Sequence, residues 1–246
     1  MHGVMLYDFN GKGQSDVPFG NTGNIVETRV NRRIQPIHFG VNYHASPLQF
    51  TLVFGSLEPI DRFDMQEIAL WLTGHQSYQW MTIDQPDLSH LFFRCLITQL
   101  TPISFGWLPV AFEATVVCDC PYAYGFPFEY KKEVRGSDSL LIRNESTVRE
   151  FIKPELVISP IGGVDTISIR NTDDGGRTFQ LSGIPSSVSQ ITVDNTNGII
   201  TANNNINLYG GFNAKFFRLV LGDNHLMITG DCTLTIRGRQ LYNVAG

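Results

Sequence analysis

SPLQFTLVFGSLEPIDRFDMQEIALWLTGHQSYQWMTI, residues Ser46–Ile83, is the stretch that decides the fold of the first half of the chain. Between Leu48 and Phe54, every second residue is large and apolar. This period of two is typical of a half-buried strand, because successive side chains of a strand point to opposite faces of the sheet. We therefore predict a strand over residues 48–54, then a helix, then a second strand over residues 78–83.

The helix is predicted over Arg62–Thr73 from its start signal, its apolar spacing and its stop signal. Asp61 can accept hydrogen bonds from the first N–H groups of a helix, and Asp64 places a carboxylate at the positive end of the helix dipole. Gly74 is a common kind of C-terminal stop. The apolar residues at i, i+3, i+4 and i+7 form one stripe that has to pack on a sheet: Met65, Ile68, Ala69 and Leu72.

A long hairpin is predicted downstream, with strands over residues 90–104 and 108–118. Its turn carries two large aromatic residues. At an exposed tip their rings would form an adhesive surface for another protein, whereas the alternative is that both rings fold back onto their own domain. We also expect interface residues on the helix and on the N-terminal arm, residues 1–20, which is irregular or partly stranded. The candidate interface residues are Phe105, Trp107, Met65, Trp71, Tyr7 and Phe9.

The domain boundary is predicted at Pro121–Phe128, where two prolines and a glycine interrupt the strand pattern. This gives a first domain over residues 1–127 and a second over residues 128–246. The second half shows short apolar stretches separated by turn signals, and no helical pattern. Such regular spacing argues for a β-sandwich or jelly roll. Strands are expected at residues 140–143, 155–159, 167–171, 178–182, 189–194, 198–202, 216–221, 225–229 and 232–237.

Charge and composition exclude several classes of protein. The net charge of −5 falls in the first domain, since residues 1–127 carry 6 Lys and Arg against 11 Asp and Glu, and residues 128–246 carry 12 of each. Because no basic stripe exists, sequence-specific nucleic-acid binding is disfavoured. The apolar runs are too short for membrane insertion, and the polar N-terminus predicts no secretory signal, so folding in a cytoplasm is expected.

No catalytic or metal-binding constellation is evident, so we expect neither an enzyme nor a cofactor. The nucleotide-binding, serine-hydrolase and zinc-protease motifs are absent. Cys118 and Cys120 lie two apart on a predicted strand and would share a face, but buried free thiols explain them without a metal. Asp173, Asp174 and Asp194 are explained by turn formation, because they lack the regular spacing of a calcium loop.

Three segments in this order and spacing resemble the distal tail protein family of long non-contractile-tailed bacteriophages. They are the opening stretch, HLFFRCLITQLTPIS (His90–Ser104) and VAFEATVVCDCPYAYG (Val110–Gly125). In the family, a strand leads into one helix, and the core of that helix motif corresponds here to Asp64–Leu72. The ending GFNAKFFRLVLGDNHLMITGDCTLTIRGR (Gly211–Arg239) also looks like the last hairpins of the family's second domain. The resemblance covers nearly the whole chain and is more specific for residues 24–125 than for residues 126–246.

The resemblance implies a mostly β fold: an N-terminal β-sandwich with one α-helix and a long hairpin, plus a C-terminal galectin-like β-sandwich. It implies a homo-oligomeric ring, with a hexamer as the expected form, at the distal end of the tail in the virion. The expected partners are the tail tube protein, the tape measure protein, the tail-associated lysin or tail fibre protein, and the receptor-binding protein.

Two rival functions stay open at the level of sequence. A β-sandwich adhesion module would bind carbohydrate through its second half, which contains Tyr209, Phe212 and Tyr242 but no Trp. However, the alternating Phe217, Leu219 and Leu221 are interpreted as core, and fold analogy alone gives no function. A cell-wall hydrolase would need two carboxylates across a cleft, and no segment shows such a pair.

In the ring, an acidic wall would repel phosphate, so that DNA passes through the channel without binding.

Overall fold

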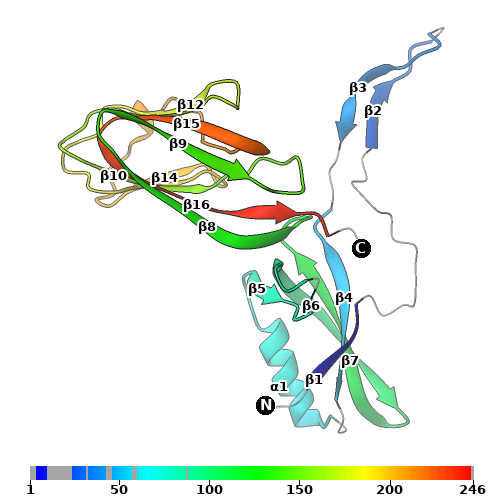
Figure 1. Ribbon diagram of the computed structural model, residues 1–246. Coiled ribbons are helices and arrows are strands. Elements are labelled where there is room, and N and C mark those ends of the chain that lie inside the picture. The colour runs from blue at the N-terminus through cyan, green and yellow to red at the C-terminus, as the bar shows by residue number, and fades with distance from the viewer. Residues whose placement is uncertain are drawn as a thin grey trace. The chain divides into compact units, whose positions relative to one another are not determined.

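The computed structural model describes residues 4–9, 24–31, 33–42, 46–56, 60–86 and 88–244. It divides into two compact units, shown in Figure 1: unit 1 comprises Met1–Tyr124 and Asn243–Gly246, and unit 2 comprises Gly125–Tyr242. Both units consist mainly of antiparallel strands, and α1 (Arg62–Thr73) is the single α-helix of the described residues. The predicted fold class, mostly β with one helix, is confirmed. The sequence places the boundary after residue 127, whereas the two units divide within a strand.

Unit 1 is built on one antiparallel sheet with the strand order β1-β4-β7-β6, and β5 pairs with β6. Its core contains Phe50, Phe93 and Val116, each less than a tenth exposed, and the rings of Phe50 and Phe93 meet edge to face at 5.5 Å. A separate two-stranded sheet joins β2 and β3. The strands are β1 (Val4–Phe9), β2 (Asn24–Thr28), β3 (Ile37–Asn42), β4 (Gln49–Ser56), β5 (Gln79–Thr82), β6 (Phe92–Phe105) and β7 (Leu108–Cys118).

The helix α1 begins and ends at the predicted residues. Its N-terminus forms a capping box, and at its C-terminus the N–H of Gly74 donates to the carbonyl oxygen of Leu70. The Asp61 carboxylate accepts hydrogen bonds from the N–H groups of Phe63 (2.7 Å) and Asp64 (2.8 Å), and Asp64 in turn accepts from the N–H of Asp61. The helix contacts β6, and its predicted apolar stripe is half-buried at all four positions: Met65, Ile68, Ala69 and Leu72.

Unit 2 is a β-sandwich of two antiparallel sheets with the strand orders β8-β16-β10-β13-β14 and β12-β11-β15-β9. Its single core contains Leu156, Ile169 and Leu226, all fully buried. The elements are β8 (Ala123–Val134), β9 (Ser137–Asn144), β10 (Glu155–Pro160), β11 (Ile167–Asn171), β12 (Arg177–Leu181), β13 (Ile191–Asp194), β14 (Ile199–Ala202), the 3₁₀ turn η1 (Tyr209–Gly211), β15 (Gly222–Thr229) and β16 (Cys232–Tyr242).

The two units divide after Tyr124, within the predicted segment Pro121–Phe128, but the strand pattern is not interrupted there, because β8 runs through most of the segment. Gly125 does not mark a turn. A Cβ added there would lie 2.6 Å from the ring of Tyr242 on β16, and a Cβ at Gly238 of β16 would lie 2.6 Å from the ring of Phe128. The two glycines therefore make room for an aromatic ring on the paired strand, an arrangement that stabilises a sheet.

Two smaller predictions in the chain are also wrong. Residues 216–221 form no strand: Leu219 makes one isolated bridge with Ile152, and Leu221 is 47% exposed rather than part of the core. Cys118 and Cys120 do not share a strand face, because β7 ends at Cys118. Phe217 and Leu219 are buried as expected.

Candidate assembly surfaces

The outer side of α1 carries a second set of apolar side chains, which no part of the described chain buries. Phe63 is 78% exposed, Leu70 is 76% exposed and Trp71 is 67% exposed. Phe63 and Leu70 are seven residues apart and lie opposite the half-buried stripe on the helix. A helix that packs only on its own sheet normally presents polar residues on this side. This outer helix face is therefore a candidate surface for another protein.

The turn of the β6–β7 hairpin is the second candidate surface of unit 1. Trp107 is 98% exposed, and Ile103 on β6 is 40% exposed. Ile60, just before α1, donates its N–H to the carbonyl oxygen of Pro109 at 2.8 Å. The start of α1 and the hairpin turn consequently lie at the same end of unit 1, as Figure 1 shows. Of the two alternatives expected from the sequence, the exposed tip holds for Trp107, whose ring does not fold back onto unit 1.

The β2–β3 hairpin is a third apolar surface. Ile34 is fully exposed, Phe39 is 67% exposed, and Val26 and Val30 are each nearly half exposed. The two strands pair only with each other in the described residues. An isolated two-stranded hairpin is marginally stable in water, so this segment gains stability from any further strand or surface that covers it.

The predicted interface residues occupy several places in unit 1. Trp107 and Trp71 lie on the candidate surfaces, whereas Met65 is half-buried on the inner side of α1. Tyr7 and Phe9 belong to β1, which pairs with β4, and Phe105 ends β6; these three side chains lie outside the described ones.

Other members of these surfaces were not predicted from the sequence: Phe63, Leu70, Ile34 and Phe39. Trp80 of β5, which is 50% exposed, was not predicted either. The seven-residue spacing of Phe63 and Leu70 was the available signal for the helix. No local pattern separates an exposed Trp80 or Phe39 from a buried one.

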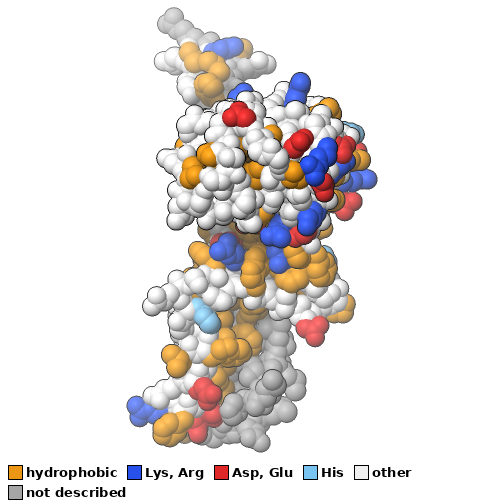
Figure 2. All heavy atoms as spheres, turned by 90° about the vertical axis from the view of Figure 1, so that its left-hand side faces the viewer, with side chains coloured by type: hydrophobic (Ala, Val, Ile, Leu, Met, Phe, Trp, Pro, Cys, Tyr) orange, Lys and Arg blue, Asp and Glu red, His pale blue; other side chains and the backbone are white. Residues whose placement is uncertain are grey.

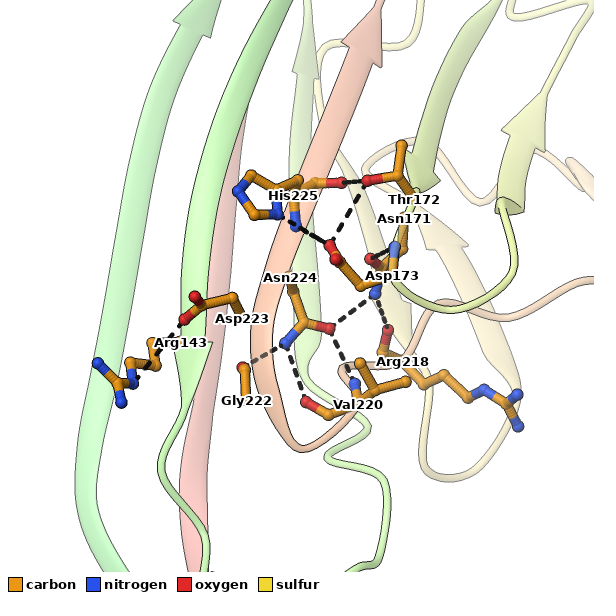
Figure 3. Close-up of polar contacts among 10 residues, drawn as sticks. All are labelled: Arg143, Asn171, Thr172, Asp173, Arg218, Val220, Gly222, Asp223, Asn224 and His225. Atoms are coloured by element: carbon orange, nitrogen blue, oxygen red, sulfur yellow. Dashed lines mark hydrogen bonds and ion pairs between the residues drawn. The ribbon is translucent and has the colours of Figure 1, made fainter.

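Polar residues of unit 2 form a hydrogen-bonded network around Asn224, shown in Figure 3. Asn224 is fully buried, and its side-chain oxygen accepts from Asn171 Nδ2 at 2.7 Å and from the Val220 N–H at 2.8 Å. Its nitrogen donates to the carbonyl oxygens of Val220 (2.9 Å) and Gly222 (3.0 Å). All four hydrogen-bonding positions of the amide are used within the fold, so it has none left for a ligand.

The acidic residues of the β11–β12 turn are likewise engaged by the fold. Asp174 accepts two hydrogen bonds from Arg218, at 2.7 and 2.9 Å, and the Arg218 guanidinium lies 3.7 Å from the centre of the Phe151 ring. The pKa of Asp173 is lowered, first because the backbone N–H of His225 donates to its carboxylate. Asp194 accepts from the N–H groups of Thr196 and Asn197, which confirms its turn role.

A shallow pocket of about 430 Å³ lies beside η1 in unit 2. It is lined mainly by Ser182, Pro185, Ile206 and the glycines of η1. The neighbouring Tyr209 is 45% exposed, but its hydroxyl group already donates to Gly198 O and accepts from Ile200 N. A hydroxyl held in this way is poorly placed to recognise a sugar.

Charged side chains are interspersed rather than gathered by sign. On the face in Figure 2, Lys and Arg (blue) lie beside Asp and Glu (red). Ion pairs of unit 2 include Arg237–Glu129 at 2.7 Å and Lys132–Asp138 at 2.9 Å. Among the described residues, no group of three or more His, Cys, Asp or Glu could hold a metal ion. No helix of the described chain has the length and apolar character to cross a membrane.

Two family descriptions match the chain almost end to end. Residues 1–120 match a phage tail protein N-terminal domain, and residues 122–237 match a phage tail C-terminal domain. The chain belongs to this phage tail protein family. A search of curated proteins gave no match for the tail protein.

Solved structures with the same fold also come from phage tails. The tail protein is similar to the Dit protein of phage SPP1, described as a paradigm of the hub adsorption apparatus in phages that infect Gram-positive bacteria. The TM-score is 0.66 at 9% identity, over 96% of this chain and 98% of Dit. A chain of the phage p2 baseplate, in its activated conformation with Sr or Ca, matches with a TM-score of 0.51 at 11% identity. It covers 95% of the tail protein and 90% of the p2 chain. With the two family matches, the Dit fold confirms the resemblance to distal tail proteins that the sequence indicated.

Proposed function

We propose that this tail protein is a non-enzymatic building block, six copies of which close into a ring at the distal end of a phage tail. Unit 1 forms the ring, and unit 2 is a galectin-like sandwich that stands outside it. The ring acts as a hub: it joins the tail tube and the tape measure protein to the tail-associated lysin or fibre protein, and it provides a place for receptor-binding proteins.

One observation carries this proposal: unit 1 exposes large apolar side chains on two of its elements, the turn of the β6–β7 hairpin and the outer face of α1. Trp107 and the outer face of α1 come from different elements, so a copy can offer one surface and receive the other. Contacts between unlike surfaces generate rings when the rotation closes. Tryptophan is also enriched among the residues that dominate the binding energy of interfaces. The description of SPP1 Dit as part of a hub supports the location at the tail tip.

The acidic charge of unit 1 fits a channel for DNA. Residues 1–127 account for the whole net charge of −5, and a ring multiplies that charge by the number of copies. A negative wall repels the phosphate backbone, so that DNA slides through without binding.

The alternative function, carbohydrate binding by unit 2, receives less support. Phe217 is buried, and Phe212 and Phe216 pack against each other with their ring centres 4.7 Å apart. The ring of Phe217 is therefore unavailable to a sugar, and those of Phe212 and Phe216 are partly covered by the core of unit 2.

Immunogold labelling of intact virions tests the location. Antibodies against unit 2 should label the distal tip of the tail and no other part, because the proposal places unit 2 on the outside of a tip ring. Antibodies against the tail tube protein, which should label the shaft, serve as the control. Label along the shaft, or no label on virions whose shafts are labelled, would contradict the proposal.

A further inference from the structure

Two cysteines lie directly opposite each other on neighbouring strands of unit 1. Cys95 of β6 is in register with Cys118 of β7. The N–H of Asp119 donates to the carbonyl oxygen of Arg94 at 2.9 Å. In an antiparallel ladder, a bond between these flanking residues makes Cys95 and Cys118 a non-hydrogen-bonded pair, with Cα atoms about 4.5 Å apart. This separation lies within the range of roughly 4.4–6.8 Å that disulfides span.

The two side chains also point to the same face of the sheet, because residues directly opposite each other in an antiparallel pair share a face, with Cβ atoms about 4.5–5.5 Å apart. Cys95 is 4% exposed and Cys118 is 1% exposed, and both belong to the core of unit 1. The pKa of Cys95 is lowered because the Cys118 thiol donates a hydrogen bond to its sulfur, and the same bond raises the pKa of Cys118. The Cys95 thiol therefore loses its proton more readily than the Cys118 thiol, which lies directly opposite it.

We propose that Cys95 and Cys118 form a disulfide when the protein passes from a reducing to an oxidising medium. Both thiols are free in this structure, the state expected in a cytoplasm. The disulfide covalently closes the base of the β6–β7 hairpin, which carries Trp107 at its turn. The claim that this change of medium occurs when virions leave the host rests on the proposed function. The chemistry of the cysteine pair does not depend on that function.

The reaction with diamide, an azo oxidant, shows the electron balance. The Cys95 thiolate attacks one azo nitrogen, an S–N bond forms, and the other nitrogen takes the electron pair and a proton. The Cys118 sulfur, losing its proton, then attacks the Cys95 sulfur. The S–N bond breaks, and the hydrazine leaves with that proton. Two thiols have become one disulfide, and the oxidant has gained two electrons and two protons.

The remaining cysteines provide internal controls. Cys120 lies beyond the end of β7, and its thiol donates to the carbonyl oxygen of Tyr122 at 3.1 Å. Cys232 is fully buried in the separate core of unit 2. Burial raises the pKa of both thiols, which makes them poor attacking groups.

The test oxidises the folded, full-length protein with diamide, blocks free thiols with N-ethylmaleimide and maps the peptides by mass spectrometry. We expect one intramolecular crosslink, Cys95 to Cys118, with Cys120 and Cys232 free. The midpoint of thermal unfolding should rise by on the order of 5 °C or more, and dithiothreitol should reverse the rise. The variants C120S and C232S should form the same Cys95–Cys118 crosslink as the wild type, and C95S and C118S should show no crosslink.

The outcomes separate the chemistry from the proposed function. Free thiols throughout, a crosslink that includes Cys120 or Cys232, or a crosslink between chains would overturn the pair, whether or not the protein forms rings. Virions alkylated without reductant should contain the Cys95–Cys118 disulfide. If the purified protein forms the disulfide on oxidation but the two thiols are reduced in virions, the proposal that the disulfide forms in the phage would be overturned.

Discussion

Replacing Asn224 with alanine should lower the free energy of unfolding of unit 2 by about 3–4 kcal/mol, the largest stability effect that we expect from a single polar residue. The side chain is fully buried and makes four hydrogen bonds, of which two accept from Asn171 and Val220. Alanine removes the side-chain partner of the Val220 N–H and of the part-buried carbonyl oxygens of Val220 and Gly222. Asn171 loses its bond of 2.7 Å and keeps only the longer one, of 3.3 Å, to the carbonyl oxygen of Arg218. A buried polar group without a partner costs about 1–3 kcal/mol, and partial relaxation keeps the sum below the full total.

Urea denaturation followed by two signals measures this effect in unit 2 alone. The three tryptophans, Trp71, Trp80 and Trp107, all lie in unit 1, so their fluorescence reports its unfolding, whereas far-ultraviolet circular dichroism reports both units. N224A should shift the dichroism transition and leave the fluorescence transition in place.

Two further variants control the measurement on Asn224. Asn204 is exposed and makes only bonds of 3.4 Å, so N204A should change stability by less than about 0.5 kcal/mol. The double variant N171A/N224A should cost less than the sum of the single ones, because both remove the same hydrogen bond. An N224A protein as stable as N204A would show that the network contributes nothing.

Replacing both Trp71 and Trp107 with alanine should abolish self-assembly and leave the monomer folded. The two rings are 67% and 98% exposed, so their removal costs the monomer little stability. In a closed interface, each such residue contributes about 2 kcal/mol or more, which is roughly a 30-fold change in affinity per residue. Size-exclusion chromatography with light scattering should show the variant as a monomer, at concentrations where the wild type is a ring.

The control for the tryptophan variant is L221A, which removes an exposed apolar side chain of unit 2, 47% exposed in the structure. It should assemble like the wild type. Circular dichroism should give all three proteins the same spectrum. If the double tryptophan variant still forms rings, these two surfaces do not make the contacts between copies.

Local signals in the sequence were sufficient to predict the bounds of elements that are set by residues close to one another in the chain. The helix α1 was predicted to the residue, because Asp61, Asp64 and Gly74 are all close in sequence to the backbone groups that they cap. The strand Leu108–Cys118 was predicted with the same bounds from its alternation alone.

The errors arise where a distant residue decides the local structure. Residues 216–221 have the alternation of a strand, but the N–H of Phe217 donates to Asn195 and that of Val220 to Asn224. These side chains take the place of a neighbouring strand. Gly125 predicts an interruption of the strand, but in the structure it makes room for the ring of Tyr242, which lies far along the chain. Apolar surfaces for assembly are equally hidden, since sequence alone does not tell whether Phe63 or Trp107 is covered.

The mass of the purified protein in solution tests the central claim most directly. Light scattering after size exclusion, over a range of concentrations, should give a main species near six times the 27.6 kDa of one chain. Negative-stain images of that peak should show closed rings. A monomer at every concentration, both alone and mixed with the tail tube and tape measure proteins, would contradict the assignment of a ring-forming hub.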